Sequence, residues 1–505
     1  MAAKQTEQAT PAVSNVLLSP DTPGYVHVQG LTQASAQLVS ELLTQNHTLY
    51  KTRWKDTLHN HLVHHLLAMW ALGATPTEIQ DMWDYNARYQ DPMNEGQPAA
   101  NASDICLKDP ATFQQCLGIN DCYPDFLQFF ENEIEEKGME AVIREYLLQG
   151  DERANDILGR MFAGSTAPSI DLSLFLTKIK VSLTRFLFSD LVHPIIHLGC
   201  GIEFHQPSLV AEALAGACVH ENWPKTFLIP TEEYVRTHPN EPSQSMLQLL
   251  ESLSENPDIV GGTKETDPFN KIPDGFLKRV TPAQLVPYLA RFQVQPDPTD
   301  LQDKMSDMMH TNAYMLAAAQ RPGKHAAMDF VTLHAVTLAV FFPAILAQPW
   351  LSNAEKARLL EATVRVGGVM YAGTGCPPLY ADRVVNYTPH RPSDGWAELF
   401  HRANVYRDEG HAVKLIRSLY ALEQLELPPG FPIAKQDFFL IAHMGMDSIE
   451  RAMDPDEGNH VSKEVTAGVV KRVGRGGDMV VANMTRWVFY GGLPNAWRHV
   501  PDVKS

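Results

Sequence analysis

The run FVTLHAVTLAVFFPAIL, residues 330–346, restricts the fold more than any other part of the chain. It is apolar on every side of a helix, so this helix must be covered by other elements all round. It contains a histidine and a proline, and it falls short of the roughly 18 apolar residues that a membrane span needs. The run therefore predicts a buried core helix, with no membrane as a partner.

The rest of the chain also has the spacing of helices. Apolar residues recur at helical intervals in residues 125–149 and 174–199, among many other segments. Runs with the alternating pattern of strands are scarce, so we expect few strands. The sequence predicts an all-α protein: one large multi-helix domain of residues 31–505, after a loosely ordered arm of residues 1–30.

Local signals mark where some of these helices begin and end. Gly73 suits the C-terminal cap of one helix, and the tetrapeptide TPTE at 75–78 is a capping box for the next. Gly138 interrupts a later helix. Residues 254–275 are the best candidate for an internal linker, and residues 94–104 are expected to form a second loop.

The charge and the cysteines exclude other classes of protein. With a formal net charge of −18, the chain has no basic stripe to neutralise phosphates, so no nucleic acid partner is expected. The first residues lack the charged and apolar regions of a secretory signal. The six cysteines form no Cys-x-x-Cys pair and no disulfide framework. These features predict a cytoplasmic protein.

No motif for a bound nucleotide cofactor is present in the sequence. HLGCGIEF, residues 197–204, contains Gly-x-Gly, but Phe204 stands where a Rossmann fingerprint needs a small residue. The Walker A, Gly-x-Ser-x-Gly and His-Glu-x-x-His motifs are absent. We therefore assign no cofactor-binding residues, and the chemistry must come from side chains on the helices.

Histidines recur instead at the start of two apolar helical segments. The stretch HNHLVHH, residues 59–65, places His61 and His65 four residues apart, on one face of a helix. In LVHPIIHLG, His193 and His197 are also one turn apart, beside a proline that frees backbone groups. Both patterns suit metal ligands as well as ordinary packed histidines.

Two more histidines lie inside later helices. His334 belongs to the all-apolar run, where it has no water to hydrogen-bond and needs a specific partner. His411 and Lys414 are three residues apart and share a helix face. Lys414 lies nearly opposite the apolar arc of its helix, so it is either a solvated lysine or part of a helix buried on both sides.

Taken together, these histidines indicate a metal site built inside a helix bundle. Neutral imidazole is the commonest metal ligand among side chains. Non-haem iron sites usually add a carboxylate, for which Glu203, Asp329 and Glu409 are candidates by proximity. The Glu-x-x-His repeat of di-iron proteins is absent. The same imidazoles suit iron and zinc, so the spacing does not select the metal.

Four motifs in register, NHLVHHLLAMWALGA, HPIIHLGCGIEF, LHAVT and GHAVK, resemble the questin oxidase-like family of fungal polyketide pathways. The resemblance extends over residues 45–450. It implies an all-helical oxygenase, an oxidoreductase that opens the quinone ring of an anthraquinone-type polyketide, with a dioxygenase or Baeyer–Villiger-like outcome. An aromatic polyketide and dioxygen are then its substrates.

The resemblance also implies a metal centre in which four histidines and a lysine carboxylated by carbon dioxide bind Fe(II). Matched residue by residue, the ligands are His61, His193, His334, His411 and Lys414. Only the neutral amine reacts with carbon dioxide, and burial favours that form. Lysine suits this role because its pKa shifts readily, whereas arginine stays charged. The carbamate would supply the carboxylate that the motifs lack.

Two further residues are assigned to the chemistry. Thr337, one turn after His334, is placed to hydrogen-bond an oxygen species at the metal; the alternative is a threonine that bonds its own backbone carbonyl. His197, together with His65, fits the family pattern as a residue that faces the substrate or supports a ligand.

Other functions remain open at this point. A flavin-type or NADPH-dependent Baeyer–Villiger monooxygenase would give the same class of product, although the sequence has no recognisable NADPH site. A zinc hydrolase on a helical scaffold would use the same ligands. A helical binding protein would simply pack its histidines. The sequence predicts no oligomeric state.

Overall fold

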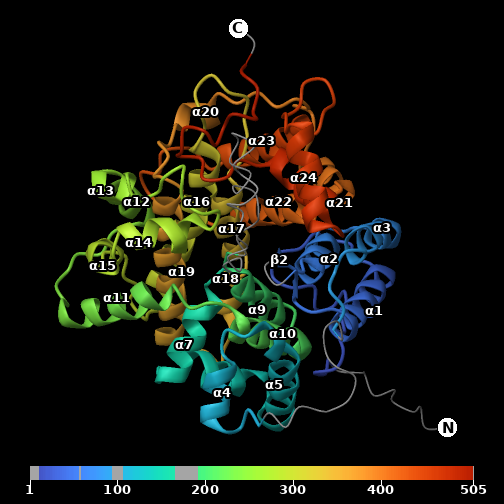
Figure 1. Ribbon diagram of the computed structural model, residues 1–505, viewed down its shortest axis with the longest axis vertical. Coiled ribbons are helices and arrows are strands. Elements are labelled where there is room, and N and C mark those ends of the chain that lie inside the picture. The colour runs from blue at the N-terminus through green and yellow to red at the C-terminus, as the bar shows by residue number, and fades with distance from the viewer. Residues whose placement is uncertain (1–10, 56–57, 94–105, 165–190, 504–505) are drawn as a thin grey trace.

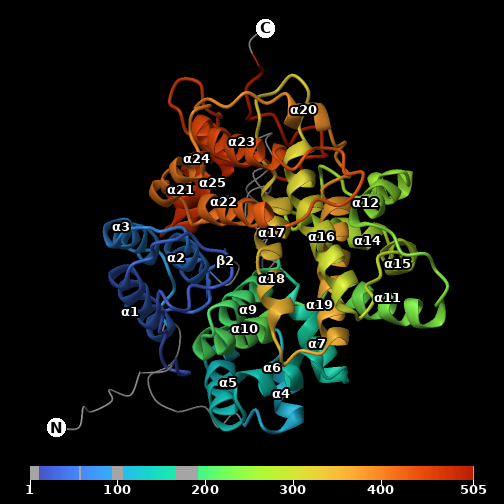
Figure 2. The same cartoon turned by 180° about the vertical axis from the view of Figure 1, so that it is seen from behind.

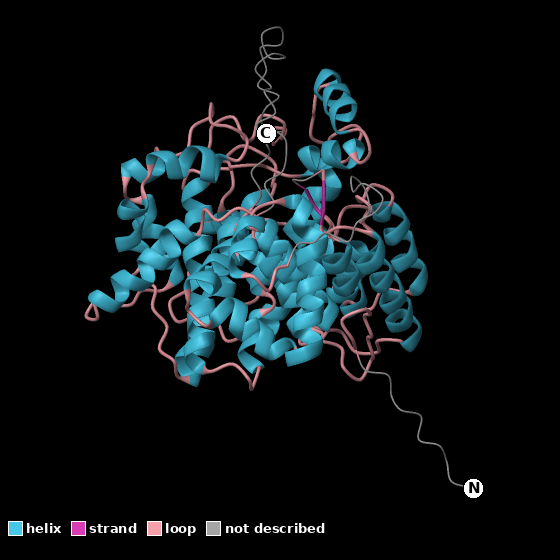
Figure 3. Ribbon diagram, turned by 60° about the horizontal axis from the view of Figure 1, so that its bottom comes forward, coloured by secondary structure: helices cyan, strands magenta, loops and turns pink. Residues whose placement is uncertain are grey.

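The computed structural model describes residues 11–55, 58–93, 106–164 and 191–503. In these ranges the regular structure is almost entirely helical, as Figure 3 shows. The described strands form one short antiparallel pair, β1 (Arg53–Trp54) and β2 (Leu58–His59). The prediction of an all-α fold with few strands is confirmed.

Four helices form the centre of the fold: α2 (Leu62–Ala71), α9 (His193–Glu203), α17 (Phe330–Ala339) and α22 (His411–Ala421). Helix α2 contacts both α9 and α22, and α17 contacts the same two helices (Figures 1 and 2). All residues of α2, α9 and α17 are buried, and in α22 only Tyr420 is partly exposed. Helices from distant parts of the chain therefore enclose one interior.

The all-apolar run is a buried core helix, as predicted, but it breaks into two. After α17 ends, a short turn leads into α18 (Phe342–Ala347), with Pro343 in the first turn, where a missing N–H costs no hydrogen bond. The stretch Phe330–Ala347 is long and apolar enough to cross a membrane, but 94% of it is buried inside the protein. Neighbouring helices cover it, so it is a core element of this fold.

The first helices pack beside α2 and have the expected caps. Both α1 (Gln33–Leu49) and α3 (Pro76–Ala87) contact α2. Gly73, after α2, has a positive φ of 77°. Thr75 and Glu78 form the predicted capping box at the start of α3, each side chain bonding the other residue's backbone N–H.

Residues 125–149 are helical and interrupted at Gly138, as expected. Helix α5 (Tyr123–Lys137) ends there, at a φ of 83° that favours glycine. It packs on α10 (Pro207–Val219), which in turn packs along α9. Shorter elements complete this group, in cyan and green in Figure 1: α4 (Pro110–Cys116), η1 (Asn120–Cys122), α6 (Met139–Ile143), η2 (Arg144–Leu148) and α7 (Glu152–Met161).

The predicted helix of residues 174–199 differs in the structure. Residues 174–190 lie outside the described part of the chain, and α9 begins at His193. Pro194 therefore lies in the first turn of a helix. Proline is favourable there because the N–H that it lacks would have no partner in the helix. It starts the helix rather than kinking one.

Four further helices cover α17 and α22. Helices α16 (Pro298–Ala318) and α19 (Asn353–Gly373) pack on α17, whereas α21 (Trp396–Val405) and α23 (Asp437–Ala452) pack on α22. The others are α11 (Lys225–Thr237), α12 (Met246–Ser254), α13 (Pro257–Val260), η4 (Ile272–Phe276), α14 (Leu277–Arg279), α15 (Pro282–Leu289), α20 (Ala381–Val385), η5 (Leu422–Gln424), α24 (Lys463–Val473) and α25 (Gly477–Arg486).

Two segments expected to be loose contribute to the packed structure. Residues 254–275, the predicted linker, contain α13 and the start of η4. Residues 11–30 contain no helix, but they pack against the core. The sequence had suggested a loosely ordered arm here. The predicted loop of residues 94–104 lies outside the described residues. The buried apolar side chains of the 11–30 segment are Val13, Val16, Leu18 and Val26.

Candidate metal centre

Four histidine side chains meet between the four central helices. His61 precedes α2, His193 and His411 are the first residues of α9 and α22, and His334 lies in the middle of α17. One ring nitrogen of each lies within 4.8 Å of the others, and all four residues are buried. The Nε2 atoms of His61 and His193 are 2.8 Å apart. We call this group the four-histidine cluster.

Backbone turns direct two of these side chains inward. The residues before α9 and α22, Val192 and Gly410, have left-handed φ values of 54° and 88°. For a β-branched residue such as Val192 this conformation costs about 1–3 kcal/mol, and strain of this kind gathers at functional sites. Gly410 also has no room for a side chain, because a Cβ would lie 2.6 Å from Cγ of His65. Conformation and space both require glycine before His411.

The four imidazoles are held in the neutral form. Burial is the main cause, since it removes the water that would stabilise a charged ring; it lowers the pKa of every one of them, to about 3 for His334. The positive charge of Lys414 lowers the pKa of His61, His334 and His411 further. A neutral ring keeps a lone pair for a metal ion.

Unsatisfied ring nitrogens point into the cluster. The Nδ1 of His334 donates to the Phe330 carbonyl at 2.6 Å, so its Nε2 carries the lone pair. That Nε2, like Nε2 of His411, is buried and has no hydrogen-bond partner among the described residues. Each such atom costs about 1–3 kcal/mol. One shared ion would satisfy several of them at once.

The spacing of the nitrogens also fits one transition-metal ion. Imidazole–metal bonds of roughly 2.1 Å place neighbouring ligand nitrogens about 3 Å apart. The Nε2 atoms of His61 and His193, 2.8 Å apart, are close to that spacing. The donor set of the four-histidine cluster is therefore suited to a metal such as iron or zinc.

Lys414 is buried beside this cluster. Its Nζ has no hydrogen-bond partner within the described ranges. Burial lowers the pKa of Lys414 to about 8, although the carboxylates of Glu409 and Asp408 act in the opposite direction. The sequence left two alternatives for Lys414: a solvated lysine, or part of a helix that is buried on both sides. In the structure α22 is buried on both sides.

Glu409 is the carboxylate that faces the cluster. Its oxygens lie 3.7 Å from Nδ1 of His61 and 3.5 Å from Nδ1 of His411. The side-chain amide of Asn483 donates to it. Burial raises the pKa of Glu409 to about 8, while the charge of Lys414 lowers it. A carboxylate behind a histidine orients the ring and makes it a stronger ligand.

The two other candidate carboxylates support the surrounding backbone. Glu203 accepts hydrogen bonds from Arg417 and from the Tyr25 backbone N–H. Asp329 caps the start of α17 and accepts the N–H of Gly491. Asn483, the partner of Glu409, was not predicted from the sequence. No local pattern could reveal it, because 74 residues separate the two.

A cavity of about 10 Å³ lies next to Lys414, with space for about one water-sized molecule. Thr337 lies on its wall. The Thr337 hydroxyl donates to the His334 carbonyl at 3.4 Å, which is the backbone bond given above as the alternative. The cavity is also lined by His64, Cys200, Phe341 and Arg417.

His197 lies in a second group of histidines. One ring nitrogen each of His59, His64 and His197 lies within 4.8 Å of the others, and all three residues are buried. We call this group the three-histidine cluster. Nε2 of His197 is 2.8 Å from a carboxylate oxygen of Glu212. This second cluster was not predicted from the sequence.

The backbone explains how HNHLVHH is divided between the two clusters. His59 ends the short strand β2, whereas His61 precedes α2 and His64 lies in its first turn. His65, one position further around the helix, belongs to neither cluster. Its Nδ1 accepts a hydrogen bond from the side chain of Asn86 at 3.3 Å.

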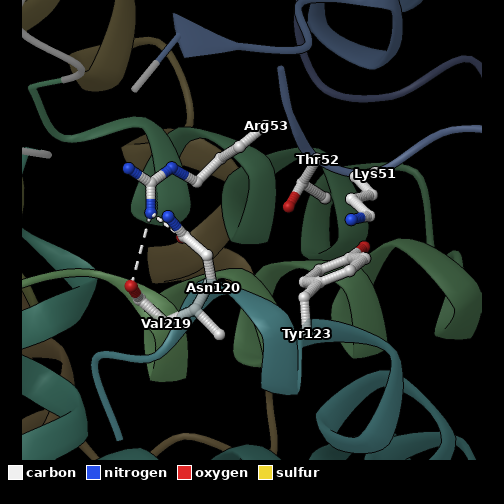
Figure 4. Close-up of a pocket in the computed structure, with 6 residues that line it drawn as sticks. All are labelled: Lys51, Thr52, Arg53, Asn120, Tyr123 and Val219. Carbon is white, nitrogen blue, oxygen red and sulfur yellow. Dashed lines mark hydrogen bonds between the residues drawn. The ribbon is translucent and has the colours of Figure 1, made fainter. Parts of the chain in front are cut away.

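Figure 4 shows another small pocket, beside β1. Its volume is also about 10 Å³. The guanidinium of Arg53 donates to the Val219 carbonyl at 3.3 Å and to the side chain of Asn120. No residue that the sequence assigned to the metal or to the chemistry lies here. The lining residues are Lys51, Thr52, Arg53, Asn120, Tyr123 and Val219.

Comparison with known proteins gives a family match and several relatives. The family model described as questin oxidase-like matches residues 58–419, which include both histidine clusters and Lys414. "Oxidoreductase AflY" from Aspergillus parasiticus is 39% identical over 506 residues, which cover 99% of this chain and 95% of that protein.

Two other relatives are similar over most of their lengths. "Questin oxidase" from Aspergillus fumigatus is 33% identical, with 82% of this chain and 88% of that protein covered. "Baeyer-Villiger oxidase ptaJ" from Pestalotiopsis fici is 30% identical, with 89% and 96% covered.

Proposed function

The chain belongs to the questin oxidase-like family, and from this membership we propose that it is an oxygenase that opens the quinone ring of an anthraquinone-type polyketide in fungal secondary metabolism. Relatives named questin oxidase and Baeyer–Villiger oxidase support an oxidative ring opening. The protein is an oxidoreductase, and its substrates in this proposal are an aromatic polyketide and dioxygen. A cytoplasmic location fits the six cysteines, which are all unpaired.

The observation that carries the proposal is the convergence of four buried, neutral imidazoles in the four-histidine cluster. We assign His61, His193, His334 and His411 as ligands of Fe(II), the metal that commonly combines imidazoles with open positions for oxygen chemistry. A bound Fe(II) ion would supply a redox-active centre for the reaction between dioxygen and the phenolic substrate. The protein's own part is to hold these nitrogens in place and to exclude water.

Lys414 completes the ligand set as a carbamate. Its neutral amine attacks carbon dioxide: an N–C bond forms, one proton is released, and the new carboxylate offers an anionic oxygen. The burial of Nζ, which has no hydrogen-bond partner in the described chain, favours the neutral amine. The adjacent cavity provides space beside Nζ for the added group.

Two residues have supporting roles. Thr337 lines the cavity, and in this proposal its hydroxyl group holds a small oxygen-containing molecule there. His197 acts through the imidazoles of the three-histidine cluster and does not line the cavity. A requirement for NADPH would distinguish a monooxygenase from a dioxygenase. A monooxygenase inserts one oxygen atom of dioxygen and reduces the other to water, which consumes two electrons from a reductant. A dioxygenase inserts both atoms and consumes no electrons from a reductant.

The test begins with protein purified anaerobically and without chelators. We expect it to contain iron and to convert questin to a ring-opened product only when dioxygen is added. Parallel reactions with and without NADPH identify the reductant requirement. Metal-free protein with undiminished turnover would overturn the proposal, and zinc-loaded protein that turns over under argon would favour a hydrolase.

The carbamate has its own test. Native mass measurement in bicarbonate buffer should find wild-type protein heavier by the mass of one carbon dioxide. Lys414→Arg keeps a positive charge but cannot form the carbamate, so it should lose the adduct and most of its bound iron. Lys304→Arg, on α16, is the matched control and should keep both. Wild-type protein without the adduct but with full iron would exclude Lys414 as a carbamate ligand.

A further inference from the structure

The three-histidine cluster has no ligand-binding task in the proposed function. Its members come from three different elements: His59 from β2, His64 from α2 and His197 from α9. They are only 3%, 2% and 1% exposed. Water cannot reach these rings, so their nitrogens must be satisfied by the protein or by a bound ligand.

His64 gives the clearest indication of a ligand. Both of its ring nitrogens are buried, and neither has a hydrogen-bond partner in the described parts of the chain. A histidine packed only for structure usually keeps one bond; His310 on α16, for example, donates through Nδ1 to the Ser306 carbonyl at 2.8 Å. Two unsatisfied nitrogens on one buried ring destabilise the fold, because neither water nor a protein group satisfies them. A bond to a metal ion would remove part of that destabilisation.

Close contacts with oxygen atoms indicate which nitrogen carries the proton on the other two rings. His59 donates through Nδ1 to the Asn60 carbonyl at 2.9 Å, so its Nε2 is the unprotonated nitrogen of the neutral ring. His197 directs Nε2 to Glu212 at 2.8 Å, and its Nδ1 is buried without a hydrogen-bond partner among the described residues. Histidines that bind metals commonly donate their second N–H to a carbonyl or carboxylate in this way.

A net negative charge stands behind this cluster. Glu212 accepts a hydrogen bond from Nδ1 of His47 at 2.7 Å, and Nε2 of His47 donates to Glu131 at 2.9 Å. Two carboxylates against one imidazolium leave one negative charge next to His197. That is the sign of charge that stabilises a cation bound by neutral imidazoles.

We propose that His59, His64 and His197 form a second metal site, separate from the four-histidine cluster, for a divalent transition-metal ion. Three imidazoles suit zinc, copper, nickel or iron(II), whereas magnesium and calcium prefer oxygen ligands. The rings of the two clusters are in contact: His59 and His193 stack with centroids 4.8 Å apart, and His61 and His64 are 5.9 Å apart. The second ion therefore lies beside the first. This inference goes beyond the proposed function.

Cobalt(II) titration of metal-free protein tests the proposal, with the absorption spectrum reporting the ligands and elemental analysis counting the ions. Wild-type protein should bind two Co²⁺ per chain. His64→Phe keeps an aromatic ring but removes both nitrogens, so it should bind one. His334→Phe should also bind one, with the spectrum of the other site. His310→Phe, an equally buried histidine outside both clusters, is the control and should bind two.

Glu212→Gln provides a second variant that preserves the rings and a hydrogen-bond acceptor. It should weaken Co²⁺ binding at the three-histidine cluster by about 10–100-fold and leave the other site unchanged, because it removes only the charge behind His197. If His64→Phe does not fold, the Co²⁺ affinity of Glu212→Gln tests the second site in its place. Unchanged affinity at both sites would count against the second site.

The two proposals fail in different ways. If wild-type protein binds one Co²⁺ that His64→Phe retains and His334→Phe loses, the second site is overturned and the proposed iron centre stands. If the single ion is lost in His64→Phe and kept in His334→Phe, the second site is supported and the four-histidine cluster is not a metal centre. If no cobalt binds, both are overturned.

Discussion

Glu409 shows how one buried carboxylate can influence two ligands. It lies between Nδ1 of His61 and Nδ1 of His411, held by Asn483. Glu409→Gln keeps the shape and the Asn483 contact but cannot ionise beside a bound cation, so we expect about 10–100-fold weaker metal binding at the four-histidine cluster. Competition with a chelator of known affinity measures this.

A matched control for that change is Glu133→Gln. Glu133 is a buried glutamate on α5 that accepts hydrogen bonds from Tyr146 and Lys137, away from both clusters. Its substitution should leave metal affinity unchanged. Equal affinity in wild-type protein and Glu409→Gln would mean that this carboxylate does not act on the ligands.

His47 makes the stability of the fold depend on pH. Burial lowers its pKa, but hydrogen bonds to Glu131 and Glu212 outweigh that effect and raise it from 6.5 to about 10. The folded protein thus binds this proton more tightly than the unfolded chain. The stabilisation is complete below pH 6.5 and is lost as the pH rises toward 10.

In metal-free protein, we therefore expect the free energy of unfolding to fall over this pH window, and to fall less in His47→Gln. Urea unfolding at several pH values measures both. His401→Gln, on an exposed side chain, is the control and should follow the wild-type curve. Parallel curves for wild-type protein and His47→Gln would contradict the role of His47.

At the residue scale, the sequence indicated the histidines of the four-histidine cluster and, through its nearness to His411, Glu409, but not the more distant partners. Each of these histidines stands out because it interrupts an apolar helical pattern, which is a local signal. Glu212 and Asn483 carry no such signal, since each meets its histidine or carboxylate only through the fold. The separation of His59 and His64 from His61 likewise depends on where β2 ends and α2 begins.

At the scale of elements, Gly410 determines how α22 enters the centre. Gly410→Ala would impose a φ of 88° on alanine and place its Cβ 2.6 Å from the ring of His65. Gly150→Ala meets the same conformational cost, at a φ of 82°, but in open space. We expect the first variant to lose clearly more than the roughly 1 kcal/mol expected of the second. Equal shifts in melting temperature would mean that space beside His65 is not limiting.

Close packing between α9 and the start of α18 leads to a prediction in which two glycine-to-alanine changes have opposite effects on stability. A Cβ on Gly199 would lie 2.4 Å from Cγ of Phe341, so Gly199→Ala should cost about 1–3 kcal/mol through overpacking. Gly468, inside α24, has open space, and Gly468→Ala should stabilise by up to about 1 kcal/mol through helix propensity. Urea unfolding measures both changes, and changes of the same sign would contradict this explanation.

At the scale of the whole molecule, a metal ion should act as a cross-link between distant helices. An ion bound only by the folded chain stabilises it by about 2.7 kcal/mol when its free concentration is 100 times the dissociation constant. We expect chelators to lower the melting temperature of wild-type protein, and to have a smaller effect on His334→Phe. A melting temperature that chelators leave unchanged would show that the fold holds no such ion.

The fold class was predictable from the sequence because helical periodicity is a local property. The all-apolar run and the capping box at Thr75 both behave as expected. The packing of residues 11–30 was not predictable, because this segment has no period of its own and is held by contacts with distant helices. The position of Pro194 was read wrongly as an interruption, since proline is also favoured in the first turn.

The histidines of the four-histidine cluster are spread over most of the polypeptide, from His61 to His411. During translation the last of them leaves the ribosome only after more than four-fifths of the chain has been made. A nascent chain therefore holds an incomplete coordination set until late in its synthesis. A product of a premature stop before Gly410 would lack His411 and Lys414, so in the proposed function iron held at the four-histidine cluster would distinguish finished polypeptides from truncated ones.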